Sequence, residues 1–372
     1  LDDASAAITN SVSKAERAAG IEITEAFVSL AGSHVSSINS NGVAGISQNQ
    51  WGIEQADIDR ALDAAQAIAI PHGRRAVHVI PRGFIVDEQE GVRTPLGMHG
   101  FRLEVEAHIV TASTSTIQNL EKCIENSGIH VADWVLNPLA SADLLLTDTE
   151  RDMGVVLVDI GGGTTGLAIY INGNVWHTMV LPIGGNHISS DIAHGLRLPA
   201  QTAEEIKIEH GHARWRDIDA SEALTITPFG AETPQRISRK DLAMIIEARV
   251  EEIFSLVLQE IKRSGYDGLL PAGIVITGGV AHLPGIRQVA SDVLKLPARI
   301  AAPANLRGLS DALNQKPEYS TSIGLINWGV NQILAAPDPA TVRRQSSGGQ
   351  GSGIMQAIMD FIRRLFLPAS PD

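Results

Sequence analysis

The sequence has a single cysteine, Cys123, and few aromatic residues, which make up 4% of its 372 residues. One cysteine cannot form a disulfide within the chain, and such scarcity is typical of proteins from a reducing compartment. No catalytic pattern surrounds Cys123, so we expect a small buried apolar side chain there. Because aromatic residues are scarce, the core must be built mostly from aliphatic side chains and alanine.

Long hydrophobic runs and an excess of positive charge are also missing. No apolar stretch reaches about 18 residues, the length that a helix needs to span a membrane. The formal net charge of −13 argues against a general affinity for nucleic acid. The chain also lacks a Gly-x4-Gly-Lys-Ser/Thr motif, which excludes the P-loop class of nucleotide-binding proteins.

A glycine-rich turn between two apolar strands is the most informative motif. The sequence VVLVDIGGGTTGLAIYI, residues 155–171, predicts a buried strand, a turn and a returning strand, and the Asn-Gly pair after it predicts a hairpin to a third strand. Glycines in the turn expose backbone N–H groups that an anionic oxygen can approach closely. We therefore expect a phosphate-binding turn formed by Gly161, Gly162, Gly163, Thr164 and Thr165.

Asp159 lies at the end of the first of these strands, just before the glycines. A carboxylate beside bound phosphate can hold a hydrated Mg²⁺ or orient a water molecule. Asp159 is therefore the candidate catalytic and metal-positioning residue. The alternative is a glycine-rich hairpin at a corner of a sheet, with no ligand.

Two further glycine pairs extend the candidate site. Gly278 and Gly279 follow the apolar strand GIVIT, and their distance along the chain from the first turn suggests two half-domains that face each other across a nucleotide. In this interpretation the second pair lets the adenosine side of the ligand approach. Gly184 and Gly185 open a predicted helix, whose N-terminus offers a third point of close approach.

Glu204 and Lys207 lie three residues apart in the helical segment AEEIKIEHG. Side chains with this spacing share one helix face. They either contact a ribose or a base edge, or form an ion pair on an exposed surface. The sequence leaves both possibilities open.

Amphipathic spacing predicts helices in both halves of the chain. Residues 2–19 form the first, with Gly20 as its stop, and residues 239–264 form a long one. Residues 324–334 are expected to be the last helix of the globular body.

A segment of different character interrupts the first half of the chain. Residues 34–110 contain one helical pattern and several extended runs. The run over residues 101–112 alternates apolar and polar residues, as a half-solvated antiparallel strand does. We interpret this segment as an inserted α+β subdomain. The predicted lobes around it comprise residues 1–33 with 111–183, and residues 184–336.

The order of these motifs resembles the superfamily of actin, heat-shock chaperones and sugar kinases. DIGGGTTG, IGGNHISSDIAHGL and GGVAHLPGI carry this resemblance. Within the superfamily, the chain is similar to the FtsA family of bacterial cell-division proteins over nearly its whole length. The segments that match are AERAAGIEITEAFVSLAGSHVSS, HVIPRGFIVDEQEGV, LASADLLLTDTERDMGVVLVDIGGGTT and AEEIKIEHG.

The resemblance implies an α/β fold of the actin-like (ribonuclease-H-like) type with two lobes, an inserted subdomain that helps to build protofilaments, and ATP with Mg²⁺ as ligands. It also implies a protein that tethers the tubulin-like division protein FtsZ to the membrane and recruits later division proteins. Its place would be the cytoplasmic face of the inner membrane at the division site. The alternative is an actin-like pilus-assembly protein (PilM), or another ATPase or kinase of the superfamily.

Two features depart from the family pattern. The family begins with a strand, a phosphate loop and a second strand that would precede Leu1, so we expect that residues are missing upstream. The family usually has aspartate after the two threonines, where this sequence has Gly166. Because that carboxylate helps to arrange Mg²⁺ and water, we expect ATP binding with weak or no hydrolysis.

The composition changes after residue 336. Residues 337–353 are rich in glycine, serine and proline, as flexible linkers are. Residues 354–367 have a helical pattern with a narrow polar arc, and a helix of about 21 Å is too short to cross a hydrocarbon core of about 30 Å. We expect it to lie in the membrane interface; the alternative is docking on its own domain or on a partner. The residues expected to contact the membrane are Ile354, Ile358, Phe361, Ile362, Arg363, Arg364, Leu365 and Phe366.

Overall fold

The computed structural model describes residues 1–46, 51–304, 306 and 313–335. The predicted linker, 337–353, and the predicted membrane helix, 354–367, lie outside the described residues. The elements, in chain order, are α1 (Asp2–Ala19), β1 (Glu25–Leu30), β2 (Val35–Gly45), α2 (Gln55–Ala69), β3 (Arg74–Val86), β4 (Gln89–Val92), β5 (Arg102–Ser113), α3 (Thr114–Glu125), β6 (His130–Leu136), α4 (Asn137–Leu145), α5 (Asp148–Met153), β7 (Val155–Ile160), β8 (Thr165–Ile171), β9 (Asn174–Leu181), α6 (Gly185–Leu196), α7 (Ala200–His210), η1 (Trp215–Asp217), β10 (Ala223–Ile226), β11 (Gln235–Ser238), α8 (Arg239–Ser264), β12 (Gly273–Thr277), η2 (Gly279–His282), α9 (Ile286–Leu294), β13 (Ala298–Ile300), η3 (Pro317–Tyr319) and α10 (Ser320–Ala335).

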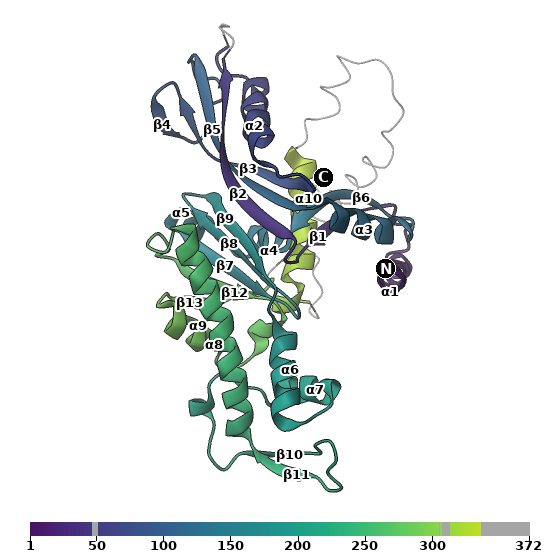
Figure 1. Cartoon of the computed structure of the whole chain (residues 1–372). Coiled ribbons are helices and arrows are strands. Elements are labelled where there is room, and N and C mark those ends of the chain that lie inside the picture. The colour runs from purple at the N-terminus through teal and green to yellow at the C-terminus, as the bar shows by residue number, and fades with distance from the viewer. Residues whose placement is uncertain (47–50, 305, 307–312, 336–372) are drawn as a thin grey trace, which may run out of the picture.

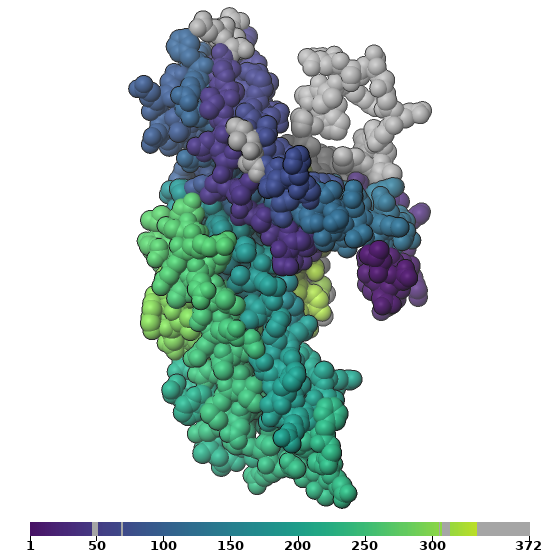
Figure 2. All heavy atoms as spheres, viewed as in Figure 1, coloured from purple at the N-terminus to yellow at the C-terminus, as the bar shows by residue number. Residues whose placement is uncertain are grey.

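The molecule is elongated, and three regions follow one another along its length (Figures 1 and 2). The sheet of β2–β5 with helix α2 forms one end, and a five-stranded sheet lies in the middle. Helices α6 and α7 and the β10–β11 hairpin form the other end, which α8 joins to the middle region (Figure 1). The predicted helices over residues 2–19 and 239–264 are confirmed, while the last helix begins at Ser320, earlier than predicted.

The central sheet has the strand order β13-β12-β7-β8-β9. Strand β8 is antiparallel to its neighbours, whereas β7, β12 and β13 pair in parallel. The predicted meander of β7, β8 and β9 is confirmed, and β7 is buried at every position. Asn172 and Gly173 have φ angles of 53° and 83°, which suit the tight hairpin that the Asn-Gly pair predicts. This order, with one antiparallel strand, is the ribonuclease-H-like sheet from which actin-like lobes are built.

The pairing of β12 with β7 corrects one expectation from the sequence. Thr277 lies opposite Asp159 in the parallel ladder, so the first and second glycine turns follow neighbouring strands of one sheet. The expectation that the two turns face each other from opposing half-domains is therefore wrong. Strands on both sides of the predicted lobe boundary at residue 183 belong to this one sheet.

Each face of the central sheet has its own apolar core. Val156, Val158 and Ile160 on one face pack with the helices α6, α7, α8 and α9. Val155 and Leu157 on the other face pack with α4 and with the parallel pair β1–β6. The alternation along β7 thus places every second side chain in a different core, which explains why this strand is continuously apolar.

The inserted subdomain is an antiparallel sheet of order β2-β5-β3-β4, with α2 packed on one face. A side chain at Gly42 would lie 1.9 Å from the carbonyl oxygen of Ala61, so glycine is needed for α2 to approach β2. The alternation predicted for residues 101–112 is present up to Ala107. The expectation of a half-solvated strand is wrong beyond that point, because His108 and Val110 on the opposite face are also fully buried.

Polar contacts with β9 explain the burial of His108. Its Nδ1 lies 2.7 Å from Asn39 Oδ1, and its Nε2 lies 2.9 Å from Thr178 Oγ1 on β9. Ser37 donates a hydrogen bond of 2.7 Å to the carbonyl of Thr178, and the guanidinium of Arg82 lies 4.0 Å from the centre of the Trp176 ring. The inserted subdomain is thus joined to the central sheet through polar side chains as well as apolar ones.

Burial lowers the pKa of His108 to about 3, and the nearby charges of His177 and Arg82 act in the same direction. The ring is therefore neutral in the folded protein: Nδ1 donates to Asn39, and Nε2 accepts from Thr178. Below the ordinary pKa of about 6.5, the unfolded chain binds a proton that the folded chain does not. The contribution of the neutral His108 to the free energy of unfolding is complete above about pH 6.5 and is lost as the pH falls from there towards 3.

We expect the variant His108→Gln to weaken the pH dependence of stability. Between pH 7 and pH 5 the native histidine accounts for a loss of about 2 kcal/mol in the free energy of unfolding, which the variant lacks. Urea unfolding at these two pH values measures the difference. His72→Gln, at an exposed histidine, is the matched control and should retain the native pH dependence. An unchanged pH dependence in the His108 variant would contradict a neutral, buried imidazole.

Candidate functional site

The three glycine segments predicted to form a site converge at one edge of the central sheet. A side-chain carbon at Gly278, where φ is +86°, would lie 2.5 Å from Asp159 Oδ1. A side-chain carbon at Gly184 would lie 2.5 Å from the carbonyl oxygen of Gly161. Glycine at position 278 therefore permits a close contact with the end of β7, and glycine at position 184 permits one with the first turn.

The first turn presents three free backbone donors. The N–H of Gly161 donates a hydrogen bond of 2.9 Å to the carbonyl of Thr164, which closes the turn. Within the described part of the chain, the N–H groups of Gly162, Gly163 and Thr164 donate no hydrogen bond. Gly162 and Gly163 are exposed. Successive exposed N–H groups of this kind form a concave site for an anion.

Thr165, the last residue predicted for the turn, is fully buried, and Gly166 after it is also buried. Thr165 donates its hydroxyl to the carbonyl of Ile183 at 2.8 Å, so this hydroxyl holds two segments together and is not among the exposed donors. A side-chain carbon at Gly166 would lie 3.0 Å from the ring of Pro138. The carboxylate that the family usually has at this position would thus require Pro138 to move.

The N-terminus of α6 lies against the first turn, but its first amides are already bonded. Gly185 and Asn186 donate to the carbonyls of Gly161 and Gly162 at 2.9 Å and 2.7 Å. These two N–H groups are among the donors that a helix leaves free for a ligand. In this structure these two N–H groups instead hold the first turn in place. The close approach predicted at Gly184 and Gly185 is therefore a contact between the backbone of α6 and the backbone of the first turn.

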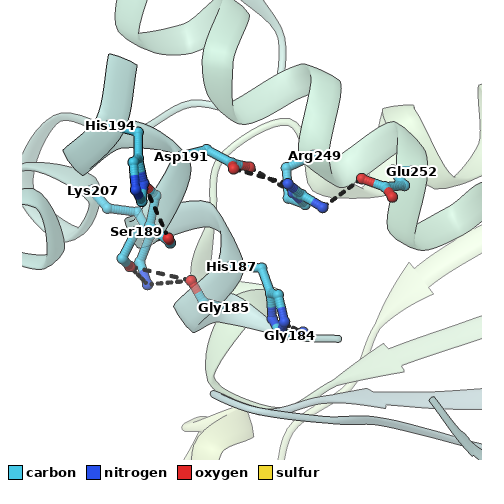
Figure 3. Close-up of polar contacts among 10 residues, drawn as sticks. Gly184, Gly185, His187, Ser189, Asp191, His194, Lys207, Arg249 and Glu252 are labelled. Atoms are coloured by element: carbon cyan, nitrogen blue, oxygen red, sulfur yellow. Dashed lines mark hydrogen bonds and ion pairs between the residues drawn. The ribbon is translucent and has the colours of Figure 1, made fainter. Parts of the chain in front are cut away.

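Lys207 lies at the centre of a polar cluster on α6 and α7 (Figure 3). Its Nζ donates to Glu204 Oε2 at 2.7 Å, to Ser189 Oγ at 3.0 Å and to the carbonyl of Gly185 at 3.2 Å. The ion pair that was one alternative for Glu204 and Lys207 is present. The Lys207 side chain is only 12% exposed, whereas that of Glu204 is 42% exposed, so the pair is open to solvent on its carboxylate side.

Glu204 has its pKa lowered in this cluster. Burial acts to raise it, but the hydrogen bonds from Lys207 and Ser189 outweigh that effect. The carboxylate therefore stays charged and partly neutralises Lys207. Ser189, which bonds both partners, gave no signal in the sequence, because a serine in an amphipathic helix is ordinary.

A chain of charged side chains holds the same helix in place (Figure 3). Asp191 on α6 accepts two hydrogen bonds from Arg249 on α8, one of them at 2.8 Å from Nη2. Arg249 also donates to Glu252 at 2.6 Å. The bidentate geometry ties the position of α6, and with it the first glycine turn, to the long helix α8.

Asp159 is 9% exposed and lies between the first and second turns. Burial raises the pKa of its carboxyl, while hydrogen bonds from Thr321 and Ser141 oppose that effect. Neither Ser141 nor Thr321 was singled out in the sequence, because they belong to helices far from Asp159 along the chain. The second turn itself leaves Gly279 exposed beside the buried Val280, which would contact a side chain at Gly185.

No ready-made metal site accompanies these residues. Among the described residues, no three His, Cys, Asp or Glu side chains come together in a way that could hold a metal ion. Mg²⁺ bound near Asp159 would thus need water or ligand oxygens to complete its coordination. None of the described helices is long and apolar enough to cross a membrane.

A cavity of about 720 Å³ lies away from the glycine turns, between α7, β10 and the start of α8. It is lined by Glu205, Glu209 and Glu222, with Arg239 paired to Glu222 at 2.6 Å. None of the residues predicted to bind a ligand lines it.

Comparison with known proteins places the fold in the actin-like class. The type IV pilus biogenesis complex of PilM and PilN contains a chain with a TM-score of 0.59 and 17% sequence identity, which covers 87% of this chain and 85% of that one. At this identity the likeness shows the fold alone. Together with the ribonuclease-H-like sheet and the inserted subdomain, it defines an actin-like protein.

Sequence comparison then identifies the family. Residues 156–324 match the family model of cell division protein FtsA, and residues 32–111 match the SHS2 domain inserted in FtsA. The FtsA of Pseudomonas aeruginosa is 43% identical over 87% of this chain and 77% of its own length. The FtsA of Neisseria meningitidis is 40% identical over 98% of this chain and 88% of its own length. The chain belongs to the FtsA family of cell-division proteins.

We expect the variant Gly184→Ala to destabilise the protein by about 1–3 kcal/mol, because its methyl group would collide with the carbonyls of the first turn. Gly163→Ala is the matched control, since nothing lies within 4 Å of a side chain there. The control should change the free energy of unfolding by less than about 0.5 kcal/mol. Urea unfolding of both variants tests this; equal stability would contradict the close backbone contact.

Proposed function

We propose that this cell-division protein binds ATP with Mg²⁺ at the edge formed by the glycine turns. The observation that carries the proposal is the row of three free N–H groups at Gly162, Gly163 and Thr164. A phosphate placed there would accept hydrogen bonds from the backbone. Lys207 binds the carbonyl of Gly185, whose N–H donates to the first turn, so we place its ammonium group in the proposed site. Gly278 and Gly279 leave room for the adenosine side of the ligand.

The predicted roles of the other residues stay part of this proposal. Asp159 would hold hydrated Mg²⁺ through one oxygen, and the backbone of Gly161, Gly184 and Gly185 would fix the shape of the turn. The absence of a carboxylate at Gly166 supports weak or absent hydrolysis. The protein would thus use the nucleotide mainly as a ligand that stabilises one conformation.

We further propose that the protein tethers the tubulin-like division protein FtsZ to the cytoplasmic membrane and recruits later division proteins. Membership of the FtsA family supports this role over that of a pilus-assembly protein, for which the likeness extends only to the fold. The inserted subdomain, predicted as residues 34–110, would contribute to self-association into protofilaments. The protein would then lie on the cytoplasmic face of the inner membrane at the division site.

We expect the variant Lys207→Gln to bind ATP about tenfold more weakly, because loss of one cation beside the phosphate removes about 1.4 kcal/mol of binding free energy. Isothermal titration with ATP and Mg²⁺ measures the change. Lys262→Gln, at an exposed lysine near the end of α8, is the control and should bind as the native chain does. Equal affinity of both variants, or no binding by the native chain at millimolar ATP, would contradict the proposed site.

We expect deletion of residues 354–372 to abolish co-sedimentation with vesicles that contain anionic lipid, because the apolar face of the predicted helix would be lost. The double variant Arg363→Gln, Arg364→Gln should weaken binding about thirtyfold, at about 1 kcal/mol for each charge. The same change at Arg343 and Arg344 in the predicted linker is the matched control and should have a smaller effect. Unchanged lipid binding after the deletion would contradict the tether.

A further inference from the structure

Asp159 shares a buried hydroxyl cluster with residues from two helices. Ser141 on α4 donates to Asp159 Oδ2 at 3.0 Å, and Thr321 on α10 donates to the same oxygen at 2.8 Å. The two hydroxyl oxygens lie 2.9 Å apart. Ser141 is fully buried, so this cluster is part of the protein interior.

The two carboxylate oxygens of Asp159 have different surroundings. Oδ2 accepts both hydroxyl hydrogens, whereas Oδ1 has no donor among the described residues and is not fully enclosed. Oδ1 lies beside Gly278, where any side-chain carbon would come within 2.5 Å of it. The glycine therefore keeps this oxygen uncovered at the edge where the first and second turns meet.

The first turn of α10 also contacts the strand that carries the second glycine turn. Ser320 Oγ lies 2.7 Å from Thr277 Oγ1 at the end of β12, and Thr277 is the ladder partner of Asp159. Both hydroxyls are fully buried. Consecutive residues of α10 thus bind the ends of β12 and β7, which fixes Thr321 in place against the carboxylate.

We infer that Ser141 and Thr321 are positioning residues, whose hydroxyls bind Oδ2 of Asp159 and so present Oδ1 alone to a hydrated divalent cation at the glycine turns. The inference rests on the proposed binding of ATP with Mg²⁺. Its physical reason is that two hydrogen bonds to one oxygen restrict the rotation of the carboxylate. Groups that orient a ligand of a metal in this way commonly change metal affinity by tenfold or more. Neither hydroxyl touches the ligand in this arrangement.

The test compares Thr321→Val, which removes the hydroxyl at nearly constant volume, with Thr321→Ser, which retains it. The first measurement is the titration of the Asp159 carboxyl by carbon-13 NMR of aspartate-labelled protein, with Asp159→Asn to assign the signal. Loss of a donor to the charged carboxylate should raise the pKa of Asp159 in the valine variant, and the serine variant should titrate as the native chain does. Ser141→Ala should raise the pKa in the same way.

The second measurement is the affinity for ATP with Mg²⁺ and with a chelator. In the valine variant we expect the affinity gained from Mg²⁺ to fall about tenfold, while the affinity for ATP without metal stays within about twofold of native. Thr321→Ser should retain the native gain. Thermal unfolding shows whether each variant is folded, and Ser141→Ala provides the same test if the valine variant does not fold.

Each outcome decides the inference. Equal carboxyl titration in the valine and serine variants, or an equal gain from Mg²⁺, would overturn it. If the native chain binds no ATP with or without Mg²⁺, the proposed function fails, and so does the positioning role. A raised pKa of Asp159 in the valine variant would in that case show that the hydroxyls bind the carboxylate in the folded protein but have no role in binding a ligand. A shifted titration together with a lost Mg²⁺ gain supports the inference.

Discussion

The parallel pairing of β7 with β12 is the constraint on which the rest of the site depends. It sets Thr277 opposite Asp159, so the two glycine turns leave the sheet at the same edge, although more than a hundred residues separate them along the chain. The side chains of β7 alternate between the two cores, so a shift by one residue would move each of them to the wrong face, and this specifies the register. Helix α6, which follows β9, and helix α9, which follows the second turn, pack in the same core on one face of the sheet. The convergence of the site follows from the pairing.

Backbone hydrogen bonds decide which part of this edge can bind a ligand. The first amides of α6 are bonded to the carbonyls of Gly161 and Gly162, and the hydroxyl of Thr165 is bonded to Ile183. Among the described residues, the N–H groups of Gly162, Gly163 and Thr164 donate no hydrogen bond, because the first turn closes through the N–H of Gly161. Glycine thus has two separate roles in the site, since some glycines expose donors and others let two backbones touch.

The inserted subdomain and α10 show how distant segments are held to the same sheet. His108, Thr178 and Asn39 form a buried polar contact, and burial lowers the pKa of the imidazole so that it is neutral. Helix α10 packs so closely on α4 that a side chain at Gly324 would lie 2.1 Å from the carbonyl oxygen of Ala140. Both contacts need specific small or polar residues, which makes each element's position well defined in this member of a cell-division family.

Local pattern was sufficient to predict much of this protein. Some elements depend mainly on residues that are close along the chain, so the sequence pattern alone predicts them. These are the buried strand β7, the Asn-Gly hairpin and the helices over residues 2–19 and 239–264. Family motifs in turn predicted the actin-like fold and the role in cell division. Three features were decided only by tertiary structure: the single sheet that contains both turns, the burial of His108 against β9, and the hydroxyls of Ser141 and Thr321 on Asp159. Thr321 lies 162 positions from Asp159, and no periodicity or spacing can connect residues that meet only when the strands pair and the helices pack.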